Sequence, residues 1–375
     1  CGSRGLGDVY KRQLLTMLVT LFLIGCDKAA DQTGIATAVA SKETFEWKLV
    51  TTWPKNYPGL GLAPENFAEK VEAMSGGRLK VKVFGAGQLV PAFEVFDAVS
   101  QGTAEMGHGA SYYWTGKSKA TAFFTSIPFG LNAQEMNGWL HYGGGLELWR
   151  ELYNEFNLIP FAAGNTGVQM AGWFNREINS MEDIKGLKMR IPGLGGDVIS
   201  RAGGVSVTIS GGELYTAMQT GVIDALEWVS PYNDIAFGFH QVAKYYYYPG
   251  WHEPGPTLEL IVNKDAYSEL PEDLQAIVEV AARAVNQDML DEYTARNNEA
   301  LITLVETHGV QLRKLPDEVV TELRGIAAEM LEELSEDSDI ARRIAESVKS
   351  FQRQATEYHK ISEEAYYQAR KEGDE

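Results

Sequence analysis

From residue 45 onward, the apolar and polar positions predict strands alternating with helices. The expected strands alternate residue by residue, and the expected helices repeat their apolar residues every three or four positions, as Phe67, Val71 and Met74 do. This rhythm is typical of a parallel sheet with helical connections. We expect strands over 45–50, 79–84 and 106–110, and helices over 65–75 and 93–99 with a turn at 101–103.

The same rhythm returns in the middle of the chain without a tandem sequence repeat. Strand-like segments fall at 160–163, 169–174, 187–191, 225–228 and 245–248, with a helix over 212–221. We therefore expect an α/β protein with two hinged domains and chain crossings between them. The expected domains are 44–165 and 166–254, followed by helical and crossover segments shared by both over 255–338.

The last third is helical and strongly acidic over 271–296 and 316–334. From 339 to 372 no glycine or proline interrupts the pattern, which predicts one long helix within 339–375. Its apolar residues fall on one face. A long helix after complete domains indicates an arm that forms a homodimer, although the same face could pack on its own chain. The residues of this face are Ile340, Ile344, Val348, Phe351, Ala355 and Tyr358.

The beginning of the chain resembles an export signal. Lys11 and Arg12 precede an apolar run over 14–24, which is too short for a permanent membrane span. The run closes on Leu-Ile-Gly-Cys at 23–26, the pattern of a lipobox. We expect residues 1–26 to be a signal peptide with lipobox, Cys26 to carry the lipid, and 27–43 to be a flexible tether; the alternative is an ordinary cleaved signal.

Residues 1–13 contain no methionine, and we expect them to be an artefactual extension. The expected location is the periplasm, with contact to the membrane only through the lipid anchor. Cys1 and Cys26 are the only cysteines, so no disulfide is expected in the mature chain.

The chain is acidic, with a formal net charge of −18. Removal of residues 1–25 takes away three basic residues and one acidic residue, which makes the charge about −20. Such a surface argues against binding of nucleic acid or of anionic lipid. An anionic ligand would need a local positive charge.

Four segments resemble the DctP-type solute-binding subunits of TRAP transporters: 51–59, 164–169, 186–193 and 224–229. The resemblance extends over about residues 45–370. It implies the periplasmic binding protein fold, with two domains that close on a small carboxylate. It also implies delivery of that ligand to TRAP membrane permease subunits, and no catalysis. Gln169 and the Glu227–Trp228 pair resemble the branch that binds 2-oxo acids or lactate together with a cation.

Arg190 is the strongest candidate for binding the ligand. It ends an apolar strand, where α/β sheets place ligands, and its guanidinium matches a carboxylate with two parallel N–H groups. The family uses the arginine of this motif for the ligand carboxylate. The alternative is a structural salt bridge between domains. Asn165 matches a motif position that lies near the ligand in the family.

The resemblance, and not the spacing, suggests a metal site. Gln169 offers an amide oxygen, Glu227 a carboxylate and Trp228 a main-chain carbonyl, and such donors suit Ca²⁺ or Na⁺. In the resembling branch this ion bridges protein and substrate, so Gln169 and Trp228 also count as substrate-binding residues. Glu253 is a further possible ligand. Alternatively, Glu227 pairs with a lysine and Gln169 bonds a strand.

Aromatic residues are expected around the ligand, and Tyr112 and Tyr113 follow a strand end where their hydroxyls could reach it. We slightly favour Tyr113. The tyrosines at 245–248 predict a strand with alternately buried rings. His252, next to Glu253, is expected to form a surface pair.

The chain lacks the sequence patterns of common enzymes. No Walker A motif, G-x-S-x-G elbow or H-E-x-x-H zinc motif occurs in it. We therefore expect a receptor for a 2-oxo or 2-hydroxy monocarboxylate rather than an enzyme. The alternatives are a receptor for a dicarboxylate or sugar acid without a metal, and a lipoprotein lyase acting on small acids.

Overall fold

The computed structural model describes residues 43–371. The expected signal peptide, the lipidation at Cys26 and nearly all of the expected tether lie outside the described residues. Among residues 43–371, no helix is both long enough and apolar enough to cross a membrane.

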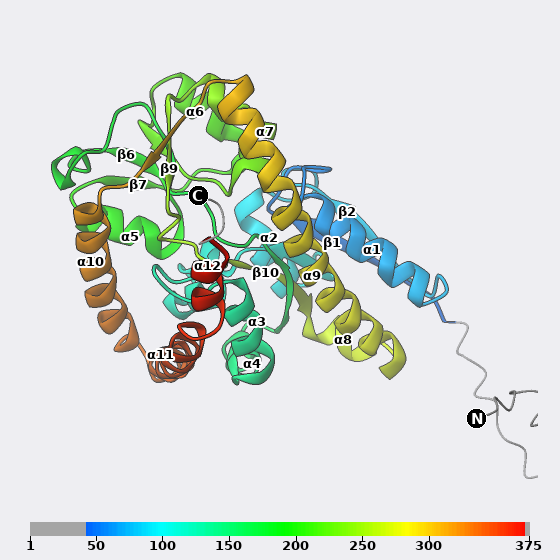
Figure 1. Cartoon of the computed structure of the whole chain (residues 1–375). Helices are drawn as coiled ribbons and strands as arrows, with labels where there is room; N and C mark the ends of the chain where they lie inside the picture. Colours follow the sequence, from blue (N-terminus) through cyan, green and yellow to red (C-terminus); the bar gives the residue numbers. More distant parts are fainter. Residues whose placement is uncertain (1–42, 372–375) are drawn as a thin grey trace, which may run out of the picture. The chain divides into compact units, whose positions relative to one another are not determined.

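The first sheet has five strands in the order β2-β1-β3-β10-β4 (Figure 1). Strand β1 is parallel to β2 and β3, while β10 is antiparallel to both of its neighbours. Strands β1, β2 and β3 lie where they were predicted, and in β1 and β2 the prediction rested on alternation. The bounds are β1 Phe45–Thr51, β2 Leu79–Phe84, β3 Met106–Gly109, β4 Leu158–Asn165 and β10 Thr257–Asn263.

The second sheet has six strands in the order β11-β9-β5-β8-β6-β7. Strands β5 and β8 are shorter than predicted. The N–H groups of Gln169 and Met170 donate to the carbonyls of Glu253 and Val229, in loops, instead of continuing β5. The bounds are β5 Gly172–Phe174, β6 Lys188–Arg190, β7 Val205–Val207, β8 Ala225–Leu226, β9 Tyr245–Tyr248 and β11 Gln311–Lys314.

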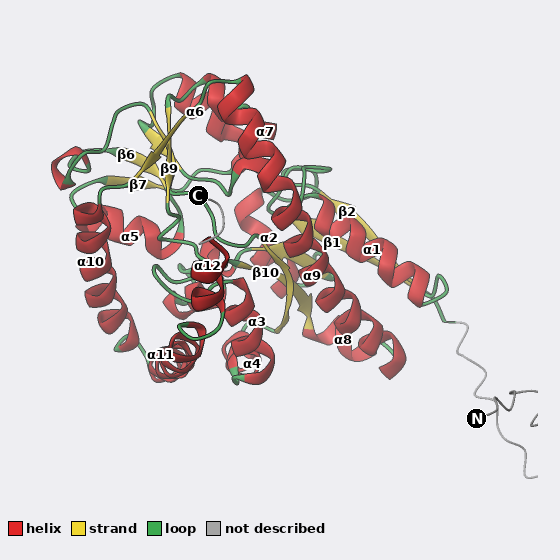
Figure 2. Cartoon of the chain, viewed as in Figure 1, coloured by secondary structure: helices red, strands yellow, loops and turns green. Residues whose placement is uncertain are grey.

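Helices cover both sheets (Figure 2). The longer ones are α1 Leu62–Met74, α3 Ala133–Tyr142, α4 Gly145–Asn154, α5 Gly193–Arg201, α9 Glu272–Ile302, α10 Asp317–Ser335, α11 Asp339–His359 and α12 Glu363–Lys371. The shorter ones are α2 Val95–Ser100, α6 Leu214–Gln219, α7 Pro231–Phe237 and α8 Lys264–Glu269. The short 3₁₀ turn η2, Ser111–Trp114, follows β3 directly.

The chain passes repeatedly between the two sheets. It leaves the first sheet after β4, returns to it at β10, and contributes β11 to the second sheet after α9. Helix α9 packs against both β4 and α7, so it spans the two halves. This mixed α/β architecture with two sheets and long C-terminal helices confirms the expected fold class.

The prediction of one uninterrupted C-terminal helix is wrong. A turn at 360–362 separates α11 from α12. The apolar face of α11 packs on its own chain, against α10, α4 and α3, and buries Ala341, Ile344, Ala345 and Val348. No residue of α11 beyond Val348 is buried, so apolar packing does not extend to the end of this helix.

The predicted alternation of buried rings in β9 is also wrong. Tyr246 and Tyr247 are both buried, because both faces of the second sheet are covered. Tyr246 stacks on Trp173 with ring centroids 4.0 Å apart, and Tyr247 meets Phe174 at 5.1 Å.

A buried carboxylate lies beside this aromatic stack. Asp234 of α7 accepts hydrogen bonds from Trp173 Nε1 at 3.0 Å, from the Tyr246 hydroxyl at 2.6 Å and from the Val229 N–H at 3.3 Å. Burial raises its pKa from 3.8 to about 7, although these hydrogen bonds lower it. Folding therefore favours the protonated form of the Asp234 carboxyl group.

This pKa shift predicts how stability depends on pH. Because the folded pKa is the higher one, the contribution of Asp234 is fully present below about pH 4 and is lost as the pH rises through about 7. The free energy of unfolding of the wild type, relative to that of Asp234→Asn, should therefore be about 3 kcal/mol larger at pH 5 than at pH 8. Urea denaturation at both pH values measures this difference. An equal difference at the two pH values would contradict the shift.

Candidate ligand and cation site

The ends of two parallel strands place an arginine beside a glutamate. Arg190 is the last residue of β6, and Glu227 directly follows β8, its parallel neighbour. The Glu227 N–H donates to the Arg190 carbonyl at 3.0 Å. Their side chains form an ion pair with Arg190 Nη1 2.6 Å from Glu227 Oε1, and each is only 1% exposed. Glu227 thus pairs with Arg190 and not with a lysine, and the pair lies within the second sheet rather than between the sheets.

The remaining N–H groups of Arg190 are used unequally. Nη1 also donates to the Glu227 carbonyl at 2.9 Å, and Nε donates to the Ile209 carbonyl at 3.2 Å. Nη2 has only a 3.5 Å contact to the Tyr113 hydroxyl. The guanidinium also lies over the Trp228 ring, 5.1 Å from its centroid. The Nη2 edge is therefore the part of this buried cation that an anion can engage.

Two chain crossings bring further oxygen atoms to the pair. Gln169 lies between β4 and β5, and Glu253 lies between β9 and β10. Gln169 Oε1 and Glu253 Oε2 are buried, and neither has a hydrogen-bond partner within residues 43–371. Burial, and then the nearby Glu227 charge, raise the pKa of Glu253 well above its usual value. Buried oxygen atoms without partners are costly unless a cation or donor meets them, so this donor set fits a hard cation.

His252 corrects the sequence interpretation. It is buried, and its Nε2 lies 3.2 Å from Glu227 Oε2, so it is not part of a surface pair. Glu227, His252 and Glu253 each offer a ligand atom, and these atoms lie within 4.8 Å of one another. Residue spacing carries no signal for His252, because only the fold brings Glu227 next to it.

Turn η2, which follows strand β3 of the first sheet, supplies two tyrosines. The ring centroids of Tyr112 and Tyr113 are 4.8 Å apart. Burial raises the pKa of both hydroxyls, so both stay protonated and can donate hydrogen bonds. Gly193 permits the close approach of α5, because it has a φ of +60° and a Cβ there would lie 3.0 Å from the Tyr112 ring.

These groups surround a small cavity, here called the inner chamber, with a volume of about 10 Å³. All lining side chains except that of Tyr113 are buried. Of the residues expected from sequence, the chamber is lined by Tyr112, Tyr113, Gln169, Arg190, Trp228 and Glu253. It is also lined by Trp53, Leu60, Thr166, Val229 and Leu258, which the sequence did not single out. Trp53, Thr166 and Val229 do belong to the segments that carried the family resemblance.

Asn165 is not brought into the inner chamber. Its side-chain amide donates to the Gly255 carbonyl at 3.0 Å, and its oxygen accepts from the Gly167 N–H at 2.9 Å. Asn165 therefore joins the two crossing segments, and Thr166 next to it lines the chamber instead.

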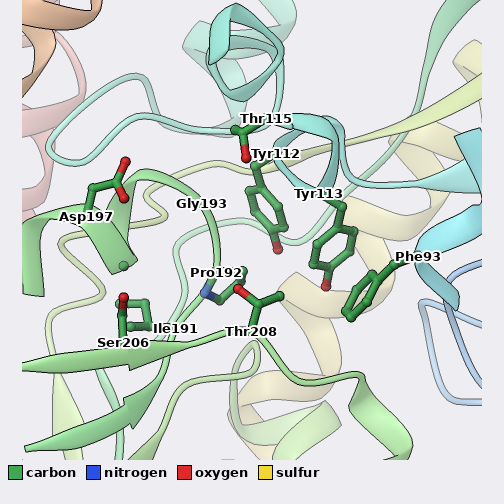
Figure 3. A pocket seen from close by; sticks show the side chains of 11 residues that line it. Phe93, Tyr112, Tyr113, Thr115, Ile191, Pro192, Gly193, Asp197, Ser206 and Thr208 are labelled. Atoms are coloured by element: carbon green, nitrogen blue, oxygen red, sulfur yellow. The ribbon is translucent and has the colours of Figure 1, made fainter. Parts of the chain in front are cut away.

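A second cavity, here called the outer pocket, has a volume of about 320 Å³ (Figure 3). It is lined by Phe93, Thr115, Asp197, Ser206, Thr208 and the segment 191–193, among others. It shares Tyr112 and Tyr113 with the inner chamber. In Figure 3 both rings descend from η2 toward Pro192 and Thr208. The two tyrosines therefore stand between the two cavities.

Comparison with known proteins gives consistent results. The model of the DctP family, bacterial extracellular solute-binding protein family 7, matches residues 49–337. A monocarboxylate 2-oxoacid-binding periplasmic protein of Nostoc sp. is 44% identical over 347 residues, which cover 92% of this chain and 94% of that protein.

Two solved structures are similar over almost their whole length. A TRAP periplasmic solute-binding protein of Pseudoalteromonas atlantica, with bound sodium and pyruvate, is 42% identical with a TM-score of 0.85, covering 87% of this chain and 99% of that one. A TRAP periplasmic solute-binding protein of Colwellia psychrerythraea, with bound calcium and pyruvate, is also 42% identical with a TM-score of 0.85. The match covers 87% of this chain and 100% of that one.

Proposed function

Because the chain belongs to the DctP family of bacterial extracellular solute-binding proteins, we propose that it is the receptor of a TRAP transporter for a small 2-oxo or 2-hydroxy monocarboxylate, bound with a bridging cation. One observation carries this proposal. A buried guanidinium edge and buried oxygen atoms without partners converge on a single small chamber. The guanidinium edge suits a carboxylate, and the oxygen atoms suit a hard cation. A receptor of this kind binds its solute and does not transform it.

In this proposal Arg190 receives the ligand carboxylate. Its Nη2 edge is the free side of the guanidinium, and Tyr113 lies next to that edge. The Tyr112 and Tyr113 hydroxyls are protonated, so they can donate to ligand oxygens. Because Glu227 already pairs with Arg190, a cation would supply the further positive charge that an anionic ligand needs here.

Glu227, Gln169, Glu253 and the Trp228 main-chain carbonyl would hold Ca²⁺ or Na⁺. The cation would supply positive charge to the ligand carboxylate and its 2-oxygen. The unpartnered oxygen atoms of Gln169 and Glu253 support this assignment. The relatives from Colwellia and Pseudoalteromonas, solved with calcium and sodium respectively, support both ions as candidates.

The size of the inner chamber favours a short ligand. Its volume of about 10 Å³ lies far below the usual range for sites of larger organic ligands. Pyruvate is bound by both solved relatives, and the Nostoc relative is named for 2-oxo acids. Pyruvate and lactate are therefore the first ligands to test.

Calorimetry of residues 44–375, refolded to remove bound solute, tests the function. We expect pyruvate or lactate to bind with one-to-one stoichiometry and without turnover, and affinity to fall when calcium and sodium are both removed. Binding of succinate alone, or of a sugar acid without any cation effect, would instead support the metal-free receptor. Formation of a product would support the lyase.

We also propose that the two domains close about the chain crossings near residues 165 and 254. The segments at 166–171 and 249–256 connect the first and second sheets and carry Gln169 and Glu253. Small-angle scattering with and without pyruvate tests this, since closure should reduce the radius of gyration. An unchanged radius would argue against hinge closure.

The homodimer is retained as a proposal that involves α12 rather than the whole C-terminal region. Tyr358, Ile361, Tyr366 and Tyr367 are between 51% and 77% exposed, and they cluster in sequence at the end of the chain. Truncation after Lys360 should reduce a dimeric mass to that of the monomer in light scattering, and it spares the buried face of α11. An equal oligomeric state before and after truncation would exclude this arm.

The lipid anchor at Cys26 is proposed from the sequence pattern at 23–26. Expressed from its own signal in a diderm bacterium, the wild type should partition with membranes, and Cys26→Ser should become soluble in the periplasm. A soluble wild type would exclude the anchor.

A further inference from the structure

Glu259 is a buried carboxylate in the middle of the first sheet. It lies on β10, opposite Gly109 of β3 and Ala162 of β4, and its side chain is fully buried. It does not line the inner chamber or the outer pocket. The proposed binding of ligand and cation therefore leaves it without a direct role.

Its hydrogen bonds reach both ends of turn η2. Ser111 Oγ donates to Glu259 Oε2 at 2.8 Å, and Trp114 Nε1 donates to Glu259 Oε1. Ser111 and Trp114 are the first and last residues of the turn, and Tyr112 and Tyr113 are the two residues between them. One carboxylate thus holds the turn at both ends.

A third hydrogen bond to the carboxylate comes from outside the turn. The Tyr153 hydroxyl of α4 donates to Glu259 Oε2 at 2.8 Å. All three partners are uncharged donors, and hydrogen bonds to an ionised acceptor are stronger than neutral ones. Burial raises the pKa of Glu259 to about 7, against the lowering effect of these three bonds. Burial of the Glu259 carboxyl group therefore costs free energy of folding. A functional role of this group would explain why the cost is tolerated.

We propose that Glu259 is a positioning residue that clamps turn η2 and so fixes Tyr112 and Tyr113 as the partition between the inner chamber and the outer pocket. This inference rests on the proposed function, because the partition matters only if the inner chamber holds the ligand. With the partition fixed, the chamber accepts short 2-oxo acids. If the partition loosens, the longer chain of a larger 2-oxo acid extends into the outer pocket.

Ser111→Ala and Tyr153→Phe are a matched pair for the test. Each removes one buried hydrogen bond of 2.8 Å to the same oxygen, Glu259 Oε2, but only Ser111 belongs to the turn. Both variants lose similar stability. Ser111→Ala should shift the ratio of affinities for pyruvate and 4-methyl-2-oxopentanoate by about fivefold or more toward the longer acid. Tyr153→Phe should leave this ratio within about twofold.

A double-mutant cycle shows whether the serine acts through the carboxylate. Glu259→Gln should shift the ratio in the same direction as Ser111→Ala, because a neutral amide binds the turn more weakly. Adding Ser111→Ala to Glu259→Gln should change the ratio by less than about twofold further. Additive shifts, or equal shifts for Ser111→Ala and Tyr153→Phe, would overturn the clamp.

Hydrogen–deuterium exchange separates a failure of the clamp from a failure of the proposed function. Without any ligand, amide exchange over 111–117 should be about fivefold faster in Ser111→Ala than in the wild type, and unchanged in Tyr153→Phe. Exchange that is the same in all three proteins overturns the clamp, whatever they bind. Faster exchange in Ser111→Ala, combined with a wild type that binds no 2-oxo acid, keeps the clamp and rejects the ligand assignment.

Discussion

Arg190→Lys is expected to weaken binding of pyruvate by a factor on the order of 100. The guanidinium presents two parallel N–H groups to a carboxylate, whereas an ammonium presents a single point charge. Arg190 is 1% exposed, so water cannot replace the lost hydrogen bond. Lysine keeps the positive charge and can still pair with Glu227, which limits the loss of stability. The effect should therefore appear in affinity far more than in melting temperature.

Titration calorimetry in the presence of calcium measures this loss. Arg201→Lys is the matched control, because Arg201 forms a bidentate pair with Glu333 on the surface, where its side chain is 38% exposed. Its affinity for pyruvate should equal that of the wild type. If Arg190→Lys binds pyruvate within about threefold of the wild type, Arg190 is not the carboxylate partner.

Glu227→Gln should change pyruvate binding in opposite directions with and without a cation. With calcium, affinity should fall, because calcium loses its most direct anionic ligand and binds about 100-fold more weakly. In chelator and without sodium, affinity should rise by at least about tenfold. Glu227 occupies Arg190 Nη1 at 2.6 Å, and its charge repels the ligand carboxylate. At about 5 Å and an effective dielectric constant of 20, this repulsion is about 3 kcal/mol.

The physical picture is an exchange of ion pairs. In the proposed site, carboxylate and cation would enter together, and each would take one partner of the Arg190–Glu227 pair, so the local charge would stay balanced. Linkage then requires calcium to raise pyruvate affinity by the same factor by which pyruvate raises calcium affinity. Glu333→Gln, on the surface, is the matched control and should behave as the wild type. Equal effects of Glu227→Gln with and without calcium would rule out the exchange.

Local pattern was enough to predict β1 and β2, because both alternate along the chain and they pair with each other in the first sheet. It failed where backbone groups bond to distant loops. The N–H of Gln169 donates to Glu253, 84 positions later in the chain, and no local pattern encodes that bond. The C-terminal helix was predicted too long because apolar periodicity shows only that a helix face can pack. It does not show whether the fold supplies something for that face to pack against. Within residues 43–371, one face of α11 is buried, whereas no residue of α12 is.

For a similar reason, the candidate site could be predicted only in part from the sequence. Arg190 could be found because it ends an apolar strand, and the family resemblance suggested Glu227 and Gln169. His252 and Glu259 could not be found, since each is given its role by a partner from another element, Glu227 and turn η2 respectively. Asn165 is the opposite case. Its motif position lies near the chamber, but its side-chain amide forms hydrogen bonds that join the two chain crossings.

In the proposed receptor, the walls of the inner chamber would also determine the timing of transport. Since nearly all of its lining side chains are buried, a solute can enter or leave only when the walls part. The observed association rate should therefore level off at high solute concentration, at the frequency of opening, which for domain motions lies on the microsecond to millisecond scale. A receptor of this kind retains its solute between openings. The lifetime of the complex then depends on how often the two halves separate, and a membrane partner that favours their separation would control when the solute is released.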